Sequence, residues 1–564
     1  MQAQDELDTA RQQLRRVQEE AIDASGEGAP LIGLALRATL AVAPGVVDNA
    51  FLETRFYAAI DEAQNLLEAL RRRADDLRER YRAESDRVAA QLVITPASDA
   101  LAKAGLEGDI PVGAGSLAAL LAPSAGAKLD ALVKLRDRID AGDDFARAEY
   151  LSALSALSPA RLALYQMRNQ GQARNPLAVA RTAEEVAWVR SWWQRLGVQE
   201  QGALILMVPG IIGNLNGISY RQRAQANRIN MENILADPKT SDDVRTALGA
   251  VRNKPQDRDG KLLSDRALIS LDLQWGGKPL GAIAIGDMDT AINVTWNIPG
   301  MGTTLADGID SWTDSALDLY EAQVYAGQIL NKADGNLAVV SWIGYETPDK
   351  PGSLGTLDVG LTDQARAGGD RLAAALDGFR DTRSGGSAPL PSVNLLAHSY
   401  GTMASADALM KVRYSVDTVT FFGSAGIDSN QIENAAALKV AKTPEGSPAV
   451  YVTQASADRV APLGVGTAGA LSIFPGLGGY RRHSPSDDWF GGINFSSEGG
   501  LDPQTGEYLK PTNGHDAKGW GEESGFSNAS EGSGYLDPGT QSLWSITRIT
   551  TGQAELVKHA SFDN

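Results

Sequence analysis

Short β-branched runs alternate with helical stretches over the later part of the chain, and this alternation limits the folds available to it. The predicted strands lie at residues 267–274, 281–287, 291–300, 337–345, 392–399, 416–424, 447–455 and 489–497. Helical patterns separate most of them, for example at residues 312–330 and 364–380. Such alternation is typical of a mostly parallel sheet with helices on both faces. The segment WGGKP between the first two strands predicts a hairpin, and therefore an antiparallel strand near one edge.

The residues before this part have a helical pattern. Over residues 55–92, apolar side chains step by three and four residues alternately, which is typical of a heptad seam, and residues 7–21 repeat the stepping. The pattern predicts a long-helix hairpin resembling a coiled coil over residues 1–95. Residues 96–199 continue as a helical region that we expect to pack on the α/β domain formed by residues 200–564.

The N-terminal helices allow two interpretations, a structural bundle and a binding site for a protein partner. Tyr57 and Asp61 fit a Tyr-x-x-x-Asp pattern that resembles type VII secretion signals. The first twenty residues lack the basic and apolar regions of a Sec signal peptide, so the localisation stays open between the cytoplasm and export by a non-Sec route. The apolar segment 29–47 contains Arg37 and Pro44, which favours a buried helix over a membrane span.

Composition excludes several classes of function. The 564 residues are too many for one hydrophobic core and predict two to four domains. The formal net charge of -18 disfavours nucleic acid and anionic membrane as partners. Cysteine is absent, which excludes disulfides, thiolate metal sites and cysteine nucleophiles. No metal or cofactor is expected, because the four histidines are scattered and the Gly-x-Gly-x-x-Gly pattern at residues 464–469 does not directly follow a strand.

The segment SVNLLAHSYGTM at residues 392–403 carries the strongest candidate for chemistry. Ser399 stands between a predicted buried strand and a predicted helix, with Ala397 two residues before it and Gly401 two residues after it. This arrangement is close to the Gly-x-Ser-x-Gly turn that exposes a serine nucleophile, with alanine in place of the first glycine. The alternative is a serine that caps the helix.

A serine nucleophile needs a histidine to accept its proton and a carboxylate to orient that histidine. Asp458 follows a strand end in the loop QASADRVAP, and His515 lies further on in NGHDAKGW. Parallel strand ends open onto one edge of a sheet, so Ser399, Asp458 and His515 are expected to converge there. Asp428 is an alternative acid and His483 an alternative base.

The other two histidines are not expected to take part. His398 neighbours the serine, and its side chain is expected to point away from the site. His559 lies near the C-terminus, where a surface position is expected.

Backbone amides complete the predicted site. One oxyanion donor is expected from Tyr400, and the other from Met301 or Gly302 in the loop PGMGTT after the third strand. Trp342 and Tyr345 lie at the end of the fourth predicted strand and either line the substrate pocket or pack in the core.

Several motifs in order resemble one known family. The segments MVPGIIGNLNGISYRQRAQANR, NIPGMGT, VVSWIGYETP, LLAHSYGT and GYLDPGTQSL are similar to those of the actinobacterial α/β-hydrolases known as the DUF1023 group. The resemblance covers roughly residues 180–560 and implies an α/β-hydrolase fold with Ser399 as nucleophile. The family histidine stands just before a Tyr-x-Asp-Pro segment, whereas residues 516–533 separate His515 from that segment here.

The sequence thus predicts a serine hydrolase, an esterase or lipase acting on a small-molecule or lipid ester without a cofactor. An amidase or a thioesterase using the same residues is one alternative. The other is a secreted interaction or effector protein in which the N-terminal helices are the working part.

Overall fold

The computed structural model describes residues 123–140, 143, 145–157, 161, 165, 182–253, 266–273, 278–329, 336–349, 362–462, 464–465, 482–519 and 533–557. All of them belong to one compact unit, Ala122–Asn564. The helical hairpin predicted for residues 1–95, the Tyr57–Asp61 pattern and His559 lie outside the described residues. The domain boundaries predicted at residues 95 and 199 stay predictions.

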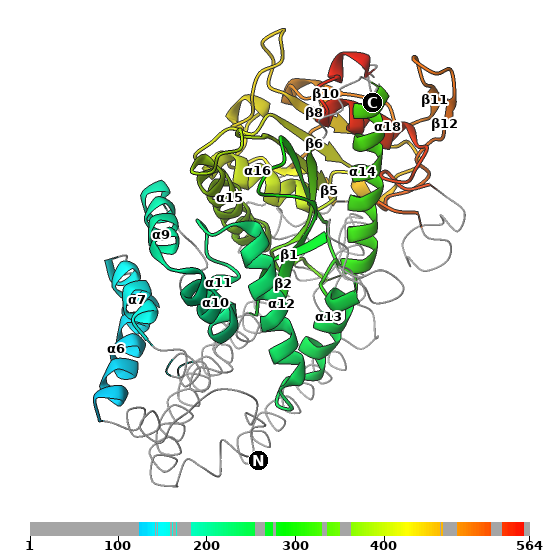
Figure 1. Cartoon of the computed structure of the whole chain (residues 1–564). Coiled ribbons are helices and arrows are strands. Elements are labelled where there is room, and N and C mark those ends of the chain that lie inside the picture. The colour runs from blue at the N-terminus through cyan, green and yellow to red at the C-terminus, as the bar shows by residue number, and fades with distance from the viewer. Residues whose placement is uncertain are drawn as a thin grey trace, which may run out of the picture. The chain divides into compact units, whose positions relative to one another are not determined.

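A mixed eight-stranded sheet is the centre of the described part (Figure 1). Its strands are β1 (Arg266–Asp272), β2 (Leu280–Gly286), β3 (Asn293–Ile298), β4 (Leu337–Ile343), β5 (Ser392–His398), β6 (Thr418–Phe422), β8 (Val450–Thr453) and β10 (Ile493–Asn494). Each strand predicted from the sequence corresponds to one of these eight.

The strand order is β1-β2-β4-β3-β5-β6-β8-β10. The predicted hairpin is confirmed, because β1 pairs antiparallel with β2, which pairs antiparallel with β4. All remaining neighbours are parallel. The carboxyl ends of β3, β5, β6 and β8 therefore lie on one edge, with Ile298 beside Ala397 and His398 beside Phe422.

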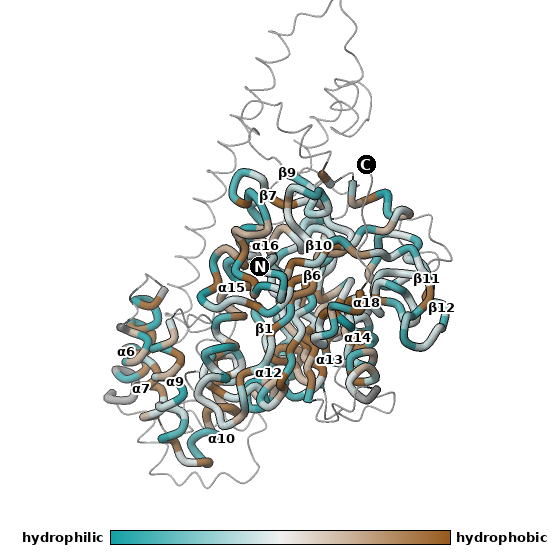
Figure 2. Tube along the Cα trace, turned by 90° about the horizontal axis from the view of Figure 1, so that it is seen from above, coloured by the Kyte–Doolittle hydropathy of each residue, from teal (hydrophilic) through white to brown (hydrophobic). Residues whose placement is uncertain are grey.

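Helices cover both faces of the sheet. Successive side chains of a strand point to opposite faces, and the side chains on each face are apolar here, so each face is buried under helices. Helices α15 (Asp363–Ser384) and α16 (Gly401–Lys411) pack on one face. Helices α13 (Asp242–Asn253), α14 (Ile309–Ile329) and α18 (Gln541–Thr550) pack on the other. Figure 2 shows the apolar segments of the strands enclosed between these helices.

The helices before the sheet share a third apolar cluster, which contains Trp192 and Trp193. They are α6 (Pro123–Asp140), α7 (Phe145–Ser155), α9 (Ala183–Arg195), α10 (Val198–Met207), α11 (Pro209–Ile212) and α12 (Tyr220–Ala236). Thr182 is the N-cap residue of α9 and forms a capping box with Glu185.

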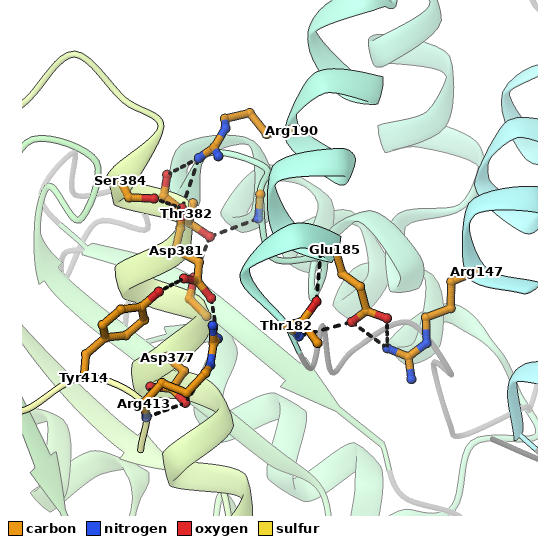
Figure 3. Close-up of polar contacts among 12 residues, drawn as sticks. Arg147, Thr182, Glu185, Arg190, Asp377, Asp381, Thr382, Ser384, Arg413 and Tyr414 are labelled. Carbon is orange, nitrogen blue, oxygen red and sulfur yellow. Dashed lines mark hydrogen bonds and ion pairs between the residues drawn. The ribbon is translucent and has the colours of Figure 1, made fainter. Parts of the chain in front are cut away.

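Polar contacts attach α9 to the end of α15 (Figure 3). The guanidinium of Arg190 donates to the backbone carbonyl oxygens of Asp381 at 3.0 Å and Thr382 at 3.4 Å. The Thr382 hydroxyl in turn accepts a hydrogen bond from the Gly217 amide at 2.9 Å. These bonds hold the helical layer against the segment that leads into β5.

Short elements complete the described part. They are the ribbon of β7 (Ile427–Asp428) and β9 (Arg482–His483), the hairpin of β11 (Gly500–Leu501) and β12 (Tyr508–Leu509), and the 3-10 turns Ala435–Ala437, Asp488–Phe490 and Ala554–Leu556. Among the residues with a described structure, no helix combines the length and the apolar character needed to cross a membrane.

Candidate active site

Ser399 occupies a tight turn between β5 and α16. Its φ of 52° is the only positive value among the described residues other than glycine, and such a conformation costs a serine roughly 1–3 kcal/mol. A Cβ on Gly401 would lie 2.4 Å from the Pro299 carbonyl oxygen, so glycine is required there. Tyr400 is the N-cap residue of α16, so Ser399 does not cap the helix. A strained, non-capping serine at a strand end is typical of a nucleophile turn.

A continuous chain of hydrogen bonds joins the three residues predicted to converge. The Nε2 atom of His515 lies 2.8 Å from Ser399 Oγ. Its Nδ1 atom lies 2.9 Å from Oδ2 and 3.0 Å from Oδ1 of Asp458. Ser399 is only 4% exposed, His515 9% and Asp458 3%. This burial keeps competing water away from the hydrogen bonds. We refer to Ser399, His515 and Asp458 as the candidate triad.

Asp458 is held in its ionised form. Burial raises the pKa of this carboxyl, but the hydrogen bond from His515, the attraction to its ring and the bonds from the Ala461 amide and Tyr535 together hold the pKa below the usual value. The amides of Val460 and Ala461 each donate to Oδ1 at 3.0 Å. An ionised Asp458 accepts the Nδ1–H of His515, which leaves Nε2 as the acceptor for the Ser399 hydroxyl.

The alternative acid and base are engaged elsewhere, on the β7–β9 ribbon. Asp428 forms an ion pair with Arg366 at 3.0 Å. The ring of His483 packs on Trp489 and Phe490, with ring centroids 4.6 Å and 5.5 Å away. Neither Asp428 nor His483 is hydrogen-bonded to a member of the candidate triad.

The expectation that the His398 side chain points away from the site is wrong. Its Nε2 atom lies 2.6 Å from the backbone carbonyl oxygen of His515, and the two rings are 4.8 Å apart. The reason is strand alternation: Ala397 faces the α15 side of the sheet, so His398 faces the α14 side. The segment that carries His515 also packs on the α14 side, where Lys518 pairs with Asp318 of α14 at 2.5 Å.

Tyr535 is a member of the site that the sequence did not indicate. Its hydroxyl donates to Asp458 Oδ2 at 3.0 Å and accepts from the Ala455 amide at 2.8 Å. The amides of Tyr535 and Leu536 donate to the carbonyl oxygens of Asp516 and Ala517 at 3.1 Å and 2.7 Å. The chain after residue 532 thus returns beside His515, so the Gly-Tyr-Leu-Asp-Pro segment is distant from this histidine in sequence but adjacent in space.

The two predicted donors in the loop after β3 differ in their contacts. The Gly302 amide donates to the carbonyl oxygen of Pro348 at 2.8 Å. The Met301 amide has no hydrogen-bond partner within the described part of the chain. The preceding Gly300 lies against the turn at Ser399, since a Cβ on Gly300 would be 2.6 Å from Ser399 Cβ. Met301 is therefore better placed than Gly302 to serve with Tyr400 as an oxyanion donor.

Trp342 and Tyr345 are both buried in the core on the α15 side of the sheet. Their rings stack with centroids 6.0 Å apart. The Tyr345 hydroxyl donates to the carbonyl oxygen of Pro299 at 2.7 Å. This placement matches the packing alternative, and it gives Tyr345 the role of anchoring the loop that precedes Met301.

No group of three histidine, aspartate or glutamate side chains is arranged to hold a metal ion among the residues described.

Comparison with known proteins agrees with the strand order and the helices on both faces of the sheet. A family model described as alpha/beta hydrolase matches residues 276–465, a range that contains β2 to β8 and Asp458. The matched region contains the strand order β2-β4-β3-β5-β6-β8 and the turn at Ser399. The chain has an α/β-hydrolase fold.

The α/β-hydrolase chain is also similar to curated proteins and solved structures. It is 28% identical over 366 residues to the uncharacterized proteins MT2140 and Rv2079 of Mycobacterium tuberculosis, covering 57% of this chain and 52% of each relative. It thus spans about half the length of the curated relatives it matches.

Among solved structures, esterase PE8 is 16% identical with a TM-score of 0.22, covering 34% of this chain and 81% of that one. A dienelactone hydrolase from Anabaena variabilis has the same identity and TM-score, covering 37% of this chain and 81% of its own.

Proposed function

We propose that this protein is a serine hydrolase that cleaves a carboxylic ester, of a small molecule or a lipid, through an acyl-enzyme. The observation that carries the proposal is the unbroken hydrogen-bond chain from Ser399 through His515 to Asp458. The positive φ of Ser399 at the end of a central parallel strand supports it. The ordered motifs described above support membership of the DUF1023 group within the α/β-hydrolases.

In the proposed reaction, Ser399 Oγ attacks the ester carbonyl carbon while its proton passes to Nε2 of His515. The new Oγ–C bond forms as the carbonyl π electrons move to the oxygen. The tetrahedral intermediate then expels the alcohol, which takes the proton from His515. Water attacks the acyl carbon by the same route, releasing the carboxylic acid and returning the proton to Ser399.

Asp458 and two amides assist these steps. Asp458 stabilises the positive charge that His515 acquires, and it holds the ring in the tautomer that accepts the serine proton. We assign the oxyanion to two backbone amides: that of Tyr400, which directly follows Ser399 in the turn, and that of Met301 in the loop after β3. Removing one such donor costs about 10²–10³ in kcat in enzymes of this type.

A fluorophosphonate probe tests the proposal directly. We expect the probe to label the full-length protein at one position, with the adduct mapped to Ser399 by peptide mass spectrometry. Ser399→Ala is expected to remain folded by circular dichroism and to stay unlabelled. Labelling at another residue, or no labelling of the folded wild type, would contradict the proposal. Matched ester, thioester and amide substrates then separate the esterase from a thioesterase or an amidase.

Replacing Tyr535 with phenylalanine is expected to lower kcat about tenfold, because a hydrogen bond to a charged group contributes roughly 1.5–3 kcal/mol. The Asp458 pKa is depressed in the folded protein, so this carboxylate stabilises the fold above its unfolded pKa and the contribution is lost as the pH falls through the folded pKa. Removing the Tyr535 hydroxyl weakens that depression.

Urea unfolding between pH 7 and pH 3 measures this second effect. The Tyr535→Phe variant should lose less stability on acidification than the wild type, from a lower starting value. Unchanged kcat together with an unchanged pH dependence of stability would remove Tyr535 from the site.

A further inference from the structure

His398 makes a contact that the proposed reaction does not use. The side chain leaves β5 one residue before Ser399, and its Nε2 atom lies 2.6 Å from the carbonyl oxygen of His515. A carbonyl oxygen only accepts hydrogen bonds, so Nε2 of His398 must carry the hydrogen. The bond joins a side chain from the nucleophile strand to the main chain of the candidate base.

The surroundings of His398 fix this ring. Its centroid lies 5.1 Å from that of Phe422 in a stacked arrangement, 6.1 Å from Trp312 and 6.3 Å from Tyr535. Burial lowers the pKa of His398 to about 3, with a further contribution from the neighbouring His515. The neutral His398 ring has a single N–H to donate, and the surrounding aromatic rings fix its orientation. That N–H donates to the carbonyl oxygen of His515.

We propose that His398 is a positioning residue that fixes the backbone of His515, so that the imidazole Nε2 stays within reach of Ser399 Oγ. This inference rests on the proposed function and deepens it. Asp458 holds the ring of His515 through Nδ1, whereas His398 holds the backbone of the same residue. With both bonds in place, neither the ring nor the loop of His515 can shift alone.

The position of His398 in the sequence explains why this arrangement is effective. His398 ends β5 and Ser399 directly follows it, so one short segment sets the position of the nucleophile and of the base together. The loop that carries His515 is far from β5 in sequence, and the backbone hydrogen bonds on either side of it, from Thr512 to Ser497 and from Tyr535 to Asp516, do not involve β5. A displacement of about 1 Å between reacting groups is enough to cost about 10²-fold in rate.

The test compares variants that remove the hydrogen bond with one that restores it. In His398→Phe an aromatic ring fills the cage but donates nothing to His515. In His398→Gln the side-chain amide nitrogen reaches roughly the position of the histidine Nε2 and donates to the same carbonyl. His483→Gln is the matched control, because it replaces a histidine that contacts none of the candidate triad.

We expect His398→Phe to lower kcat by about 10²-fold with little change in KM, and to slow fluorophosphonate labelling of Ser399 by a similar factor. His398→Gln should recover most of both rates, and His483→Gln should match the wild type. Active-site titration corrects each rate for the folded fraction, so lost stability alone does not imitate the effect. If His398→Phe does not fold, His398→Asn removes the bond through a side chain too short to reach.

Two results would overturn the inference while leaving the proposed function intact: wild-type rates in His398→Phe or His398→Asn, or a loss in His398→Gln as large as in the variants without a donor. Failure of the wild type to label at Ser399 would instead remove the proposed function on which the inference rests.

Discussion

Replacing His515 with alanine is expected to lower kcat about 10⁵-fold or more, because the serine hydroxyl then has no base to accept its proton. Nε2 of His515 is hydrogen-bonded to Ser399 Oγ at 2.8 Å. KM should change little, since the lost interaction is made with the nucleophile rather than with bound substrate. Steady-state kinetics with a chromogenic ester measures the change, and circular dichroism gives the folded fraction of each variant, because a serine without a base reacts too slowly for active-site titration.

His483→Ala is the control for this prediction. The ring of His483 packs on Trp489 and Phe490 and makes no contact with the candidate triad, so its removal should leave kcat within about twofold of the wild type. The opposite pattern, with hydrolysis retained in His515→Ala and lost in His483→Ala, would assign the base to His483.

The convergence of Ser399, Asp458 and His515 was predictable because parallel topology has few solutions. Apolar β-branched runs mark each strand, and the carboxyl ends of parallel strands meet at one edge. Ser399 directly follows β5 and Asp458 lies in the loop after β8, so these two meet there, whereas His515 lies in the longer segment that follows β10 and contains β11 and β12. The strand order is less accessible, because no local pattern places β4 between β2 and β3.

His398 and Tyr535 show where local patterns stop being informative. Strand alternation does predict that the His398 ring leaves the sheet on the face opposite to Ala397. It does not predict that the His515 loop packs on that same face, because this depends on how α14 and the C-terminal segment fold together. Tyr535 could not be predicted for a related reason. Residues 516–533 separate it from His515 in sequence, and the two residues come close in space because the segment at Tyr535 is hydrogen-bonded to the backbone of Asp516 and Ala517.

The choice between Met301 and Gly302, and the placement of Trp342 and Tyr345, depend on contacts that the residue types alone do not predict. Met301 and Gly302 are equivalent donors in the sequence, and they differ only because the Gly302 amide is bonded to Pro348. Trp342 and Tyr345 suit a pocket or a core equally well by residue type. Burial and the bond from the Tyr345 hydroxyl to Pro299 place both in the core.

Replacing Asp458 with asparagine is expected to lower kcat about 10⁴-fold while leaving the fold and KM nearly unchanged, because an amide at this position holds the His515 imidazole in the wrong tautomer for the proposed reaction. The amides of Val460 and Ala461 both donate to Oδ1 of Asp458. In the asparagine variant these two donors require an acceptor, so the side-chain oxygen takes the Oδ1 position and the nitrogen takes the Oδ2 position. The amide nitrogen then faces Nδ1 of His515 and donates to it. The hydrogen of His515 moves to Nε2, which points at Ser399 and no longer accepts its proton.

Asp428→Asn supplies the matched control, since it makes the same chemical change at a buried aspartate that pairs with Arg366 instead of a histidine. This variant should hydrolyse esters at close to the wild-type rate once its folded fraction is counted. For Asp458→Asn, kcat and the fluorophosphonate labelling rate should fall together, because both depend on deprotonating Ser399. A variant that keeps wild-type kcat would show that His515 holds its tautomer without the carboxylate, and would exclude Asp458 from the catalytic group.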